Sequence, residues 1–293
     1  MRDLSTPIQL SANKARAASL LDSVKVVYTD VDGTLVGPGG CFFLDAQQRF
    51  TLKPARALRS AHQKNLDLVM VSGRNRFQLL EDARLLGTKH YVAELGCQIV
   101  YHLGREVLLT ADKFLVKHPN KNIFQVIAAS GAVEMLFERF AGCLEYHAPW
   151  SDQRECTHLF RGYIDVDLAN RLLVDKDFSY LKLVDNGVIK RIGTLKELPE
   201  IHAYHLLPKE SGKAEAVEKD MKTRNLSKRS VVAIGDAVSD LELANKVGAL
   251  FLVKNSVIHD SSIRQALEQF DNVFLTSNEM GLGFAEVLDF LLG

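Results

Sequence analysis

Two aspartates near the start of the chain carry the clearest chemistry in the sequence. Asp30 and Asp32 stand one residue apart, directly after the apolar run 26–29, and Gly33 follows them. Every second side chain of an extended segment points to the same side, so the two carboxylates are expected to share one face. Burying two acids is costly unless hydrogen bonds or a cation compensate them. The spacing therefore predicts a site in which a divalent metal ion balances the charge.

Three further segments place polar or charged residues at comparable positions. Ser72 and Gly73 end a second apolar run, and Asp236 ends a later one. Lys213 is expected to open a helix, and Asp240 follows Asp236 by about one helical turn. Open α/β sheets bind ligands beyond the carboxyl ends of their strands. All of these side chains are therefore predicted to meet in one crevice.

The segments that must position these residues alternate between strand and helix patterns. Short apolar runs predict buried strands, and helices are expected between them, at 54–64, 75–87 and from about 213. The expected strands are 24–29, 66–71, 91–93, 98–102, 231–234 and 251–253. An alternation of this kind is typical of an α/β domain with a parallel sheet.

The middle of the chain has a different pattern. Helices are expected at 121–140 and 166–174, with a strand at 157–164. The runs 178–184 and 188–192 flank Asp185-Asn186-Gly187, which predicts a two-residue hairpin. Helices with hairpin-linked strands indicate an inserted α+β module. The predicted domains are a discontinuous core, 1–111 with 204–293, and a cap, 112–203.

Composition limits the classes of partner. The 293 residues include 36 Lys and Arg against 36 Asp and Glu, so net charge gives no reason to expect binding to nucleic acid or to an anionic membrane. The four cysteines lack metal-ligand spacing, and no run of about 18 apolar residues is present. We therefore expect a small-molecule partner and a cytoplasmic location, while the oligomeric state stays open.

In their order, the motifs resemble those of the haloacid dehalogenase superfamily of phosphatases, and most closely its type IIB, Cof-like branch. The matching segments are Asp30-Val-Asp32-Gly33-Thr34, Val71-Ser72-Gly73-Arg74, Lys213 within Pro208–Ala214, and Gly235-Asp236-Ala-Val-Ser239-Asp240. The resemblance implies a Rossmann-like parallel-sheet core with an inserted α+β cap. One position departs from the branch, which usually has asparagine where Ser239 stands.

The resemblance also implies catalytic roles for the paired aspartates. Asp30 would attack phosphorus and form an aspartyl-phosphate, which divides one difficult displacement into two easier ones. Asp32 would protonate the leaving group and then activate water. Mg²⁺, which prefers oxygen ligands, would be held by the side chains of Asp30 and Asp236 and the carbonyl of Asp32.

Other residues would bind phosphate or support the site. Ser72, the Gly73 N–H and Lys213 would hold the phosphoryl group, since a helix N-terminus favours anions. The residues expected around this inner set are Thr34, Ser239, Asp240 and Asn255. Four residues of the cap could contact the leaving group: Trp150, Arg154, His158 and Arg161.

The predicted function is Mg²⁺-dependent hydrolysis of a small phosphorylated metabolite, such as a sugar or nucleotide phosphate. Two alternatives stay open, a phosphomutase of the phosphomannomutase type and a catalytically silent binding protein on the same fold. A glycosyltransferase could also use a DxD pair, but Ser72 and Lys213 favour phosphate chemistry.

Overall fold

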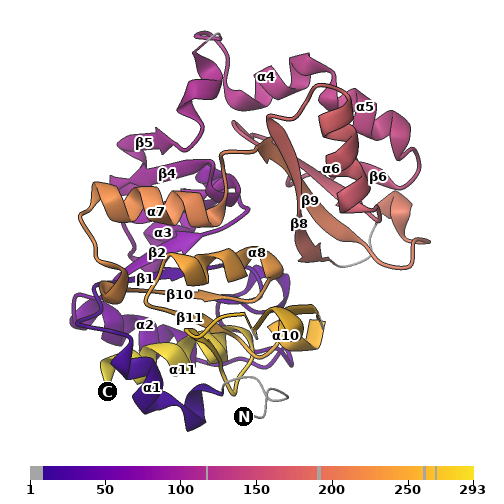
Figure 1. The fold of residues 1–293 in the computed structure, drawn as a ribbon. Helices are drawn as coiled ribbons and strands as arrows, with labels where there is room; N and C mark the ends of the chain where they lie inside the picture. Colours follow the sequence, from indigo (N-terminus) through magenta and orange to yellow (C-terminus); the bar gives the residue numbers. More distant parts are fainter. Residues whose placement is uncertain (1–8, 117, 190–192, 260–261, 268) are drawn as a thin grey trace.

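A computed structural model describes residues 9–116, 118–189, 193–259, 262–267 and 269–293, which form two sheets (Figure 1). The larger sheet has the order β12-β11-β10-β1-β2-β3-β4-β5. Its strands are β1 Val26–Thr29, β2 Asp67–Val71, β3 His90–Ala93, β4 Gln98–Tyr101, β5 Glu106–Leu109, β10 Val231–Gly235, β11 Ala249–Leu252 and β12 Val273–Leu275. Neighbours from β12 to β3 are parallel, whereas β4 and β5 run antiparallel. Strands β1 and β10, distant in sequence, therefore lie side by side at the centre.

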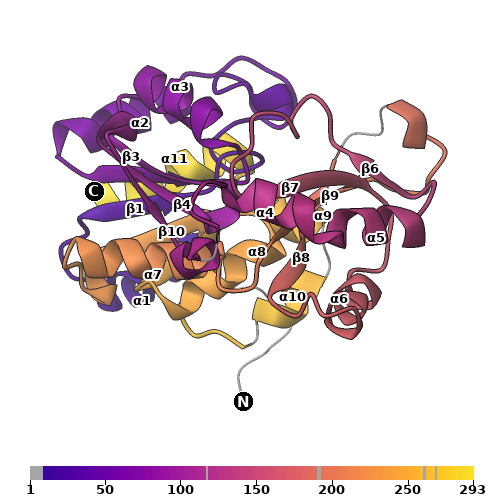
Figure 2. The same ribbon diagram turned by 90° about the horizontal axis from the view of Figure 1, so that it is seen from above.

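Helices cover both faces of this sheet (Figures 1 and 2). One face packs against α2 Lys53–Gln63, α3 Arg76–Leu86 and α11 Met280–Leu292. The other packs against α7 Lys213–Thr223, α8 Val238–Leu241, α9 Ser256–His259 and α10 Ser262–Leu267. A short helix, α1 Lys14–Ser19, precedes β1. No helix in the described part of the chain combines the length and apolarity needed to cross a membrane.

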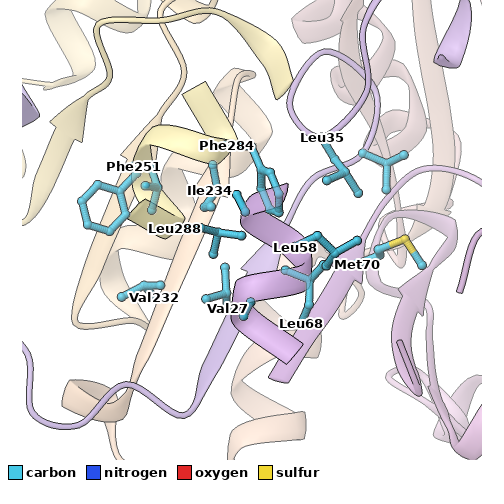
Figure 3. Packing of buried hydrophobic residues seen from close by; sticks show 14 of the residues in the cluster. Val27, Leu35, Leu58, Leu68, Met70, Val232, Ile234, Phe251, Phe284 and Leu288 are labelled. Carbon is cyan, nitrogen blue, oxygen red and sulfur yellow. The ribbon is translucent and has the colours of Figure 1, made fainter. Parts of the chain in front are cut away.

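Side chains of successive residues in the central strands point to opposite faces of the sheet, so both faces are packed. Val27 faces Leu58 of α2 and Leu288 of α11 (Figure 3), whereas its neighbours Val26 and Tyr28 belong to the cluster on the α7 side. Full burial of one such side chain contributes about 1.5–3 kcal/mol. A strand buried on both faces is mostly apolar, as Val26, Val27 and Tyr28 are, and the buried Asp30 follows directly after the strand.

The smaller sheet is antiparallel and has the order β6-β7-β9-β8. It consists of β6 Leu144–Tyr146, β7 His158–Gly162, β8 Leu181–Val188 and β9 His202–Pro208, with α4 Ile123–Ser130, α5 Ala132–Arg139 and α6 Val166–Asp175 beside it (Figure 2). The single helix predicted at 121–140 is wrong: Gly131, with a φ of +88°, separates α4 from α5. Glycine adopts this left-handed conformation readily, which ends the first helix.

The predicted hairpin at Asp185-Asn186-Gly187 is also wrong. These residues lie within β8, where the register with β9 shifts between Asp185 and Val188. The Gly187 N–H donates to Asp185 Oδ1 at 2.8 Å, so the turn-forming residues make an irregularity inside a strand instead of a reversal. Part of the second expected strand, 190–192, lies outside the described residues.

The two segments that join the sheets touch each other. Thr110 follows β5 and leads into the cap, and Ser211 follows β9 and leads back to α7. Their hydroxyl oxygens lie 2.7 Å apart, and Thr110 also donates to the Gly96 carbonyl at 2.9 Å. The domain boundaries stay predictions. Because β9 pairs within the smaller sheet as far as Pro208, we propose that the cap continues to that residue.

Buried His158 predicts an acid-sensitive cap. Burial lowers the pKa of His158 to about 4, because its ring is enclosed and stacks on Phe124 at 3.8 Å between centroids. Since the folded pKa lies below the unfolded value near 6.5, stability is complete above about pH 6.5 and is lost as the pH falls toward 4. Between about pH 7.5 and 4.5, we expect the wild type to lose about 1–3 kcal/mol more unfolding free energy than His158→Gln. Urea unfolding at both pH values measures this difference.

The exposed His118→Gln variant is the matched control for that comparison and should follow the wild type. Equal acid sensitivity of the wild type and His158→Gln would contradict the prediction.

Candidate active site

A buried ion cluster lies at the carboxyl ends of β1 and β10. Asp30 directly follows β1, and its N–H donates to the Ile234 carbonyl of β10 at 2.8 Å. Lys213, the first residue of α7, donates from Nζ to Asp30 Oδ1 at 2.8 Å and to Asp240 Oδ1 at 2.7 Å. The Lys213 and Asp240 side chains are only 2% and 0% exposed. One ammonium group thus joins a carboxylate at the end of β1 to one in helix α8.

The charges of this cluster do not balance. Burial raises the pKa of Asp30 to about 6, an effect that the attraction of Lys213 only partly offsets. Burial, together with Asp30 and Asp240, raises the pKa of Asp236 well above its ordinary value. Burial lowers the pKa of Lys213, but Asp240 and Asp30 outweigh it and raise that pKa. Lys213 alone therefore does not balance the carboxylates, which either take up a proton or need a further cation to stay ionised.

This charge pattern fits a divalent cation. One oxygen from each of Asp30, Asp236 and Asp240 lies within 4.8 Å of the others. Both oxygens of Asp240 already accept hydrogen bonds, Oδ1 from Lys213 and Oδ2 from the N–H groups of Asp236 and Ala237. Asp30 Oδ2 accepts no hydrogen bond from the described residues, and each Asp236 oxygen accepts one from a neutral side chain, so these two carboxylates have more room for a metal ion than Asp240. Ser239 Oγ is buried without a hydrogen-bond partner among the described residues, which leaves it free to bind a metal-bound water.

Two residues orient Asp236. Thr34 Oγ1 donates to Asp236 Oδ1 at 2.9 Å. Asn255 Nδ2 lies 3.2 Å from Asp236 Oδ2 and 2.9 Å from the Gly33 carbonyl, and Asn255 Oδ1 accepts from the Met280 N–H. Asn255 thus ties the turn after β1 to the loop after β10.

Gly33 allows the turn after β1 to approach Asp236. Its φ is +83°, in the left-handed region, and a Cβ added there would lie 2.3 Å from Asp236 Oδ2. Both the backbone conformation and the space exclude a side chain at this position.

Ser72 and Gly73 lie at the next strand end, after β2. Ser72 is buried, and its Oγ accepts from the Arg74 N–H at 3.2 Å. Asn75 caps α3 by accepting from the N–H groups of Phe77 and Gln78. The loop therefore sits at the N-terminus of a helix, where anions are stabilised.

Asp32 lies at the solvent edge of the site, with its side chain 58% exposed and outside the acidic cluster. Arg74 holds its carboxylate at both oxygens, with Nε to Oδ2 at 2.8 Å and Nη2 to Oδ1 at 2.6 Å. Arg74 Nη1 also donates to Asp82 at 2.8 Å. No role was inferred for Arg74 from the sequence, although it ends the Ser72-Gly73-Arg74 motif.

The cap candidates are placed differently from expectation. Trp150 is exposed, His158 is enclosed within the cap and Arg161 pairs with Glu145. Arg154 is buried and donates to the Gly73 carbonyl at 3.0 Å. None of these contacts places Arg154 beside a leaving group.

Two cap residues that the sequence did not indicate lie next to Gly73. A Cβ added at Gly73 would lie 2.8 Å from His205 Nε2 and 3.1 Å from Asn186 Nδ2. The residues predicted around the metal and phosphate thus converge from β1, β2, β10 and α7, and strands β8 and β9 of the cap cover them. Asn186 lies at the register shift in β8, where the sequence predicted a hairpin and not a contact with the phosphate loop.

Comparisons with known proteins agree with this arrangement. The sequence profile of the haloacid dehalogenase-like hydrolases matches residues 27–285. A protein of Saccharolobus solfataricus named phosphoglycolate phosphatase 1 is 25% identical over 272 residues, covering 92% of this chain and 96% of its own. The phosphoglycolate phosphatase of Sulfolobus acidocaldarius is 28% identical over 240 residues, covering 80% and 85%. The resemblance inferred from the motifs is confirmed.

Solved structures show the same fold at lower identity. Thermoplasma acidophilum protein 0175 matches with a TM-score of 0.64 and 17% identity, covering 93% of this chain and 100% of its own. The sucrose-phosphatase of Synechocystis sp. PCC6803, solved with sucrose and phosphate, matches with a TM-score of 0.63 and 14% identity, covering 92% and 98%. The predicted fold class is confirmed.

Magnesium is expected to stabilise the folded protein. A ligand that binds only the folded state at 100 times its Kd adds about 2.7 kcal/mol, and we expect MgCl₂ to raise Tm by several degrees. Asp236→Asn removes one ligand and should lose most of this rise. Thermal unfolding with MgCl₂, or with NaCl at equal ionic strength, tests the expectation.

The exposed cap residue Asp167, in the first turn of α6, provides the matched control. Asp167→Asn should respond to MgCl₂ as the wild type does, and an equal response of Asp236→Asn would contradict the metal site.

Gly33→Ala is expected to abolish the magnesium response, because the new methyl group would displace Asp236 Oδ2. Backbone strain adds a cost of about 1–2 kcal/mol. Gly39→Ala is the control, since Gly39 also has a positive φ of +72° but nothing lies within 4 Å of an added Cβ. Isothermal titration with MgCl₂ compares the two, and comparable binding by both would refute the proposed contact.

Proposed function

Because the chain belongs to the haloacid dehalogenase-like hydrolase family, we propose that it is a Mg²⁺-dependent phosphatase acting on a small phosphorylated metabolite. The predicted hydrolase class is confirmed by this membership. One observation carries the proposal: Lys213 bridges Asp30 and Asp240 while Asp236 lies within 4.8 Å of the same carboxylates. The Asp30 carboxylate is therefore buried, held in one orientation by Lys213 and next to a candidate cation site.

In the first half of the reaction, Asp30 acts as the nucleophile. Lys213 occupies Oδ1, and Oδ2 has no hydrogen-bond partner among the described residues, so Oδ2 is the attacking atom. A bond forms between Oδ2 and phosphorus while the bond to the leaving oxygen breaks. For this step Asp32 must leave its two-point contact with Arg74 and carry a proton, which it gives to that oxygen, so an alcohol departs and an aspartyl-phosphate remains.

In the second half, Asp32 takes a proton from water as the water oxygen attacks phosphorus. The Asp30 carboxylate leaves, and inorganic phosphate is released. Ser72, the Gly73 N–H and Lys213 stabilise the phosphoryl oxygens, where charge must be offset in the transition state. Mg²⁺ between Asp30 and Asp236 would supply further positive charge.

The names of the relatives suggest the first substrate to test. The two most relevant are called phosphoglycolate phosphatases, so we propose phosphoglycolate ahead of sugar and nucleotide phosphates. The packing of His205 and Asn186 against Gly73 supports a small substrate, because cap side chains fill the space beside the phosphate loop.

Hydrolysis is preferred to the alternatives. A phosphomutase would return phosphate to its substrate, whereas the relatives carry phosphatase names. The cluster of Asp30, Lys213, Asp236 and Asp240 is complete, which disfavours a silent binding protein. The cytoplasmic location stays a prediction.

Asp30→Asn is expected to bring phosphate release below detection, since an amide oxygen is a far poorer nucleophile than a carboxylate. Asp32→Asn should slow turnover by about 10²–10⁴-fold, the usual contribution of general acid–base catalysis. Release of inorganic phosphate from phosphoglycolate and from a panel of sugar and nucleotide phosphates, with MgCl₂, gives both values.

Asp167→Asn is again the control and should retain the wild-type rate. Retention of full Mg²⁺-dependent activity by Asp30→Asn would exclude it as the nucleophile, and a wild type inactive on the whole panel would refute the phosphatase.

A further inference from the structure

The phosphate loop 72–74 is held through its carbonyl groups. The Ser72 carbonyl accepts from the Leu95 N–H at 3.0 Å, and the Arg74 carbonyl accepts from the Glu94 N–H at 2.9 Å. The carbonyl between them, that of Gly73, accepts from Arg154 Nη2 at 3.0 Å. Two of the three donors are backbone groups of the core, and the third is a side chain of the cap.

One N–H group of this loop remains available. The Ser72 N–H donates to Val92, the Arg74 N–H to Ser72 Oγ and the Asn75 N–H to Gln78. The Gly73 N–H has no partner among the residues that the structure describes. It is therefore the backbone donor left for a phosphoryl oxygen.

Arg154 is itself fixed on every side. Nε donates to the Trp150 carbonyl at 3.0 Å, and Nη1 donates to Thr157 Oγ1 at 2.9 Å. Its side chain is 2% exposed, and Nη1 lies 4.0 Å from the fully buried carboxylate of Glu94. A guanidinium with all three nitrogens engaged forms a rigid fork and is not free to reach a substrate.

Glu94 anchors the cap loop that carries Arg154. Its carboxylate accepts from the N–H groups of Glu155, Cys156 and Thr157 at 2.7–3.1 Å, and from Thr157 Oγ1 at 3.0 Å. The same residue donates its own N–H to the Arg74 carbonyl. Glu94 therefore connects the cap loop to the phosphate loop.

We propose that Arg154 is a positioning residue, which fixes the Gly73–Arg74 peptide from the cap so that the preceding Gly73 N–H points at the phosphoryl group. The inference rests on the proposed function and deepens it. Arg154 acts on the phosphoryl half of the substrate and not on the leaving group. The phosphate loop is consequently complete only when the cap is docked.

The experiment compares substrates with different leaving groups. We expect Arg154→Met to lower kcat/KM by about 10–100-fold. The factor should be the same for phosphoglycolate, a sugar phosphate and p-nitrophenyl phosphate, because a misplaced Gly73 N–H affects the phosphoryl group that all three share. The inhibition constant for inorganic phosphate should rise with it. Arg154→Lys keeps the charge beside Glu94 but has one donor nitrogen in place of three, so it should raise the inhibition constant by less than Arg154→Met and still above the wild-type value.

Arg161→Met is the matched control, because Arg161 is a cap arginine paired with Glu145 and away from Gly73. It should leave the inhibition constant for phosphate unchanged. Circular dichroism and Tm show whether each variant folds. If Arg154→Met does not fold, the comparison uses Arg154→Lys. A wild-type inhibition constant for inorganic phosphate would then overturn the proposal, and a raised constant would support it.

Two other results would overturn the role of Arg154 while leaving the phosphatase intact. One is a folded Arg154→Met with unchanged phosphate inhibition, and the other is a loss that varies with the leaving group. If the wild type hydrolyses nothing, the proposed function fails separately, and calorimetric binding of inorganic phosphate to the wild type and Arg154→Met decides the positioning role. Equal affinity, or no binding by either protein, would then overturn it.

Discussion

The contact of Lys213 with Asp30 and Asp240 is the interaction on which the rest of the site depends. Three carboxylates in one place, two of them buried and that of Asp236 partly buried, would repel each other strongly, and removing the Lys213 ammonium would take away the cation that touches two of them. Losing one partner of a buried ion pair costs about 3–5 kcal/mol. With Lys213 present, the four groups together carry two negative charges when ionised. The divalent cation that we propose would neutralise that remainder.

The parallel sheet explains how this cluster can form. Strands β1, β2 and β10 are neighbours, and their carboxyl ends present Asp30, Ser72 and Asp236 at one edge. The first residue of α7 adds Lys213 from the helix layer above (Figure 1). Each residue lies just beyond a rigid element, so the apolar packing of the core fixes the geometry of a polar site.

Residues that act through short local motifs were predictable from the sequence. Asp30, Ser72, Lys213 and Asp236 each mark the end of a strand or the start of a helix, and the parallel topology brings such ends together. The helix expected at 75–87 corresponds to α3, which Asn75 and Gly87 cap. Most core strands were also predictable, because each of them is a short apolar run in the sequence.

Contacts that depend on the docking of the cap could not be predicted. Arg154 reaches Gly73 across a large sequence separation, and a single buried arginine has no periodic pattern. The hairpin expected at Asp185-Asn186-Gly187 failed because β9, a more distant segment, pairs with the whole of β8 and absorbs the turn as an irregularity. In both cases tertiary pairing outweighed a local preference.

The hydrogen bond between Thr110 and Ser211 joins the two crossings between the sheets. An insertion whose ends are held together resembles a loop that is already closed, and the entropy of closing a chain grows only slowly with its length. The catalytic half therefore tolerates replacement, shortening or enlargement of the inserted part at little thermodynamic cost. In a protein with this arrangement, substrate preference can change through new cap sequences while the core stays the same.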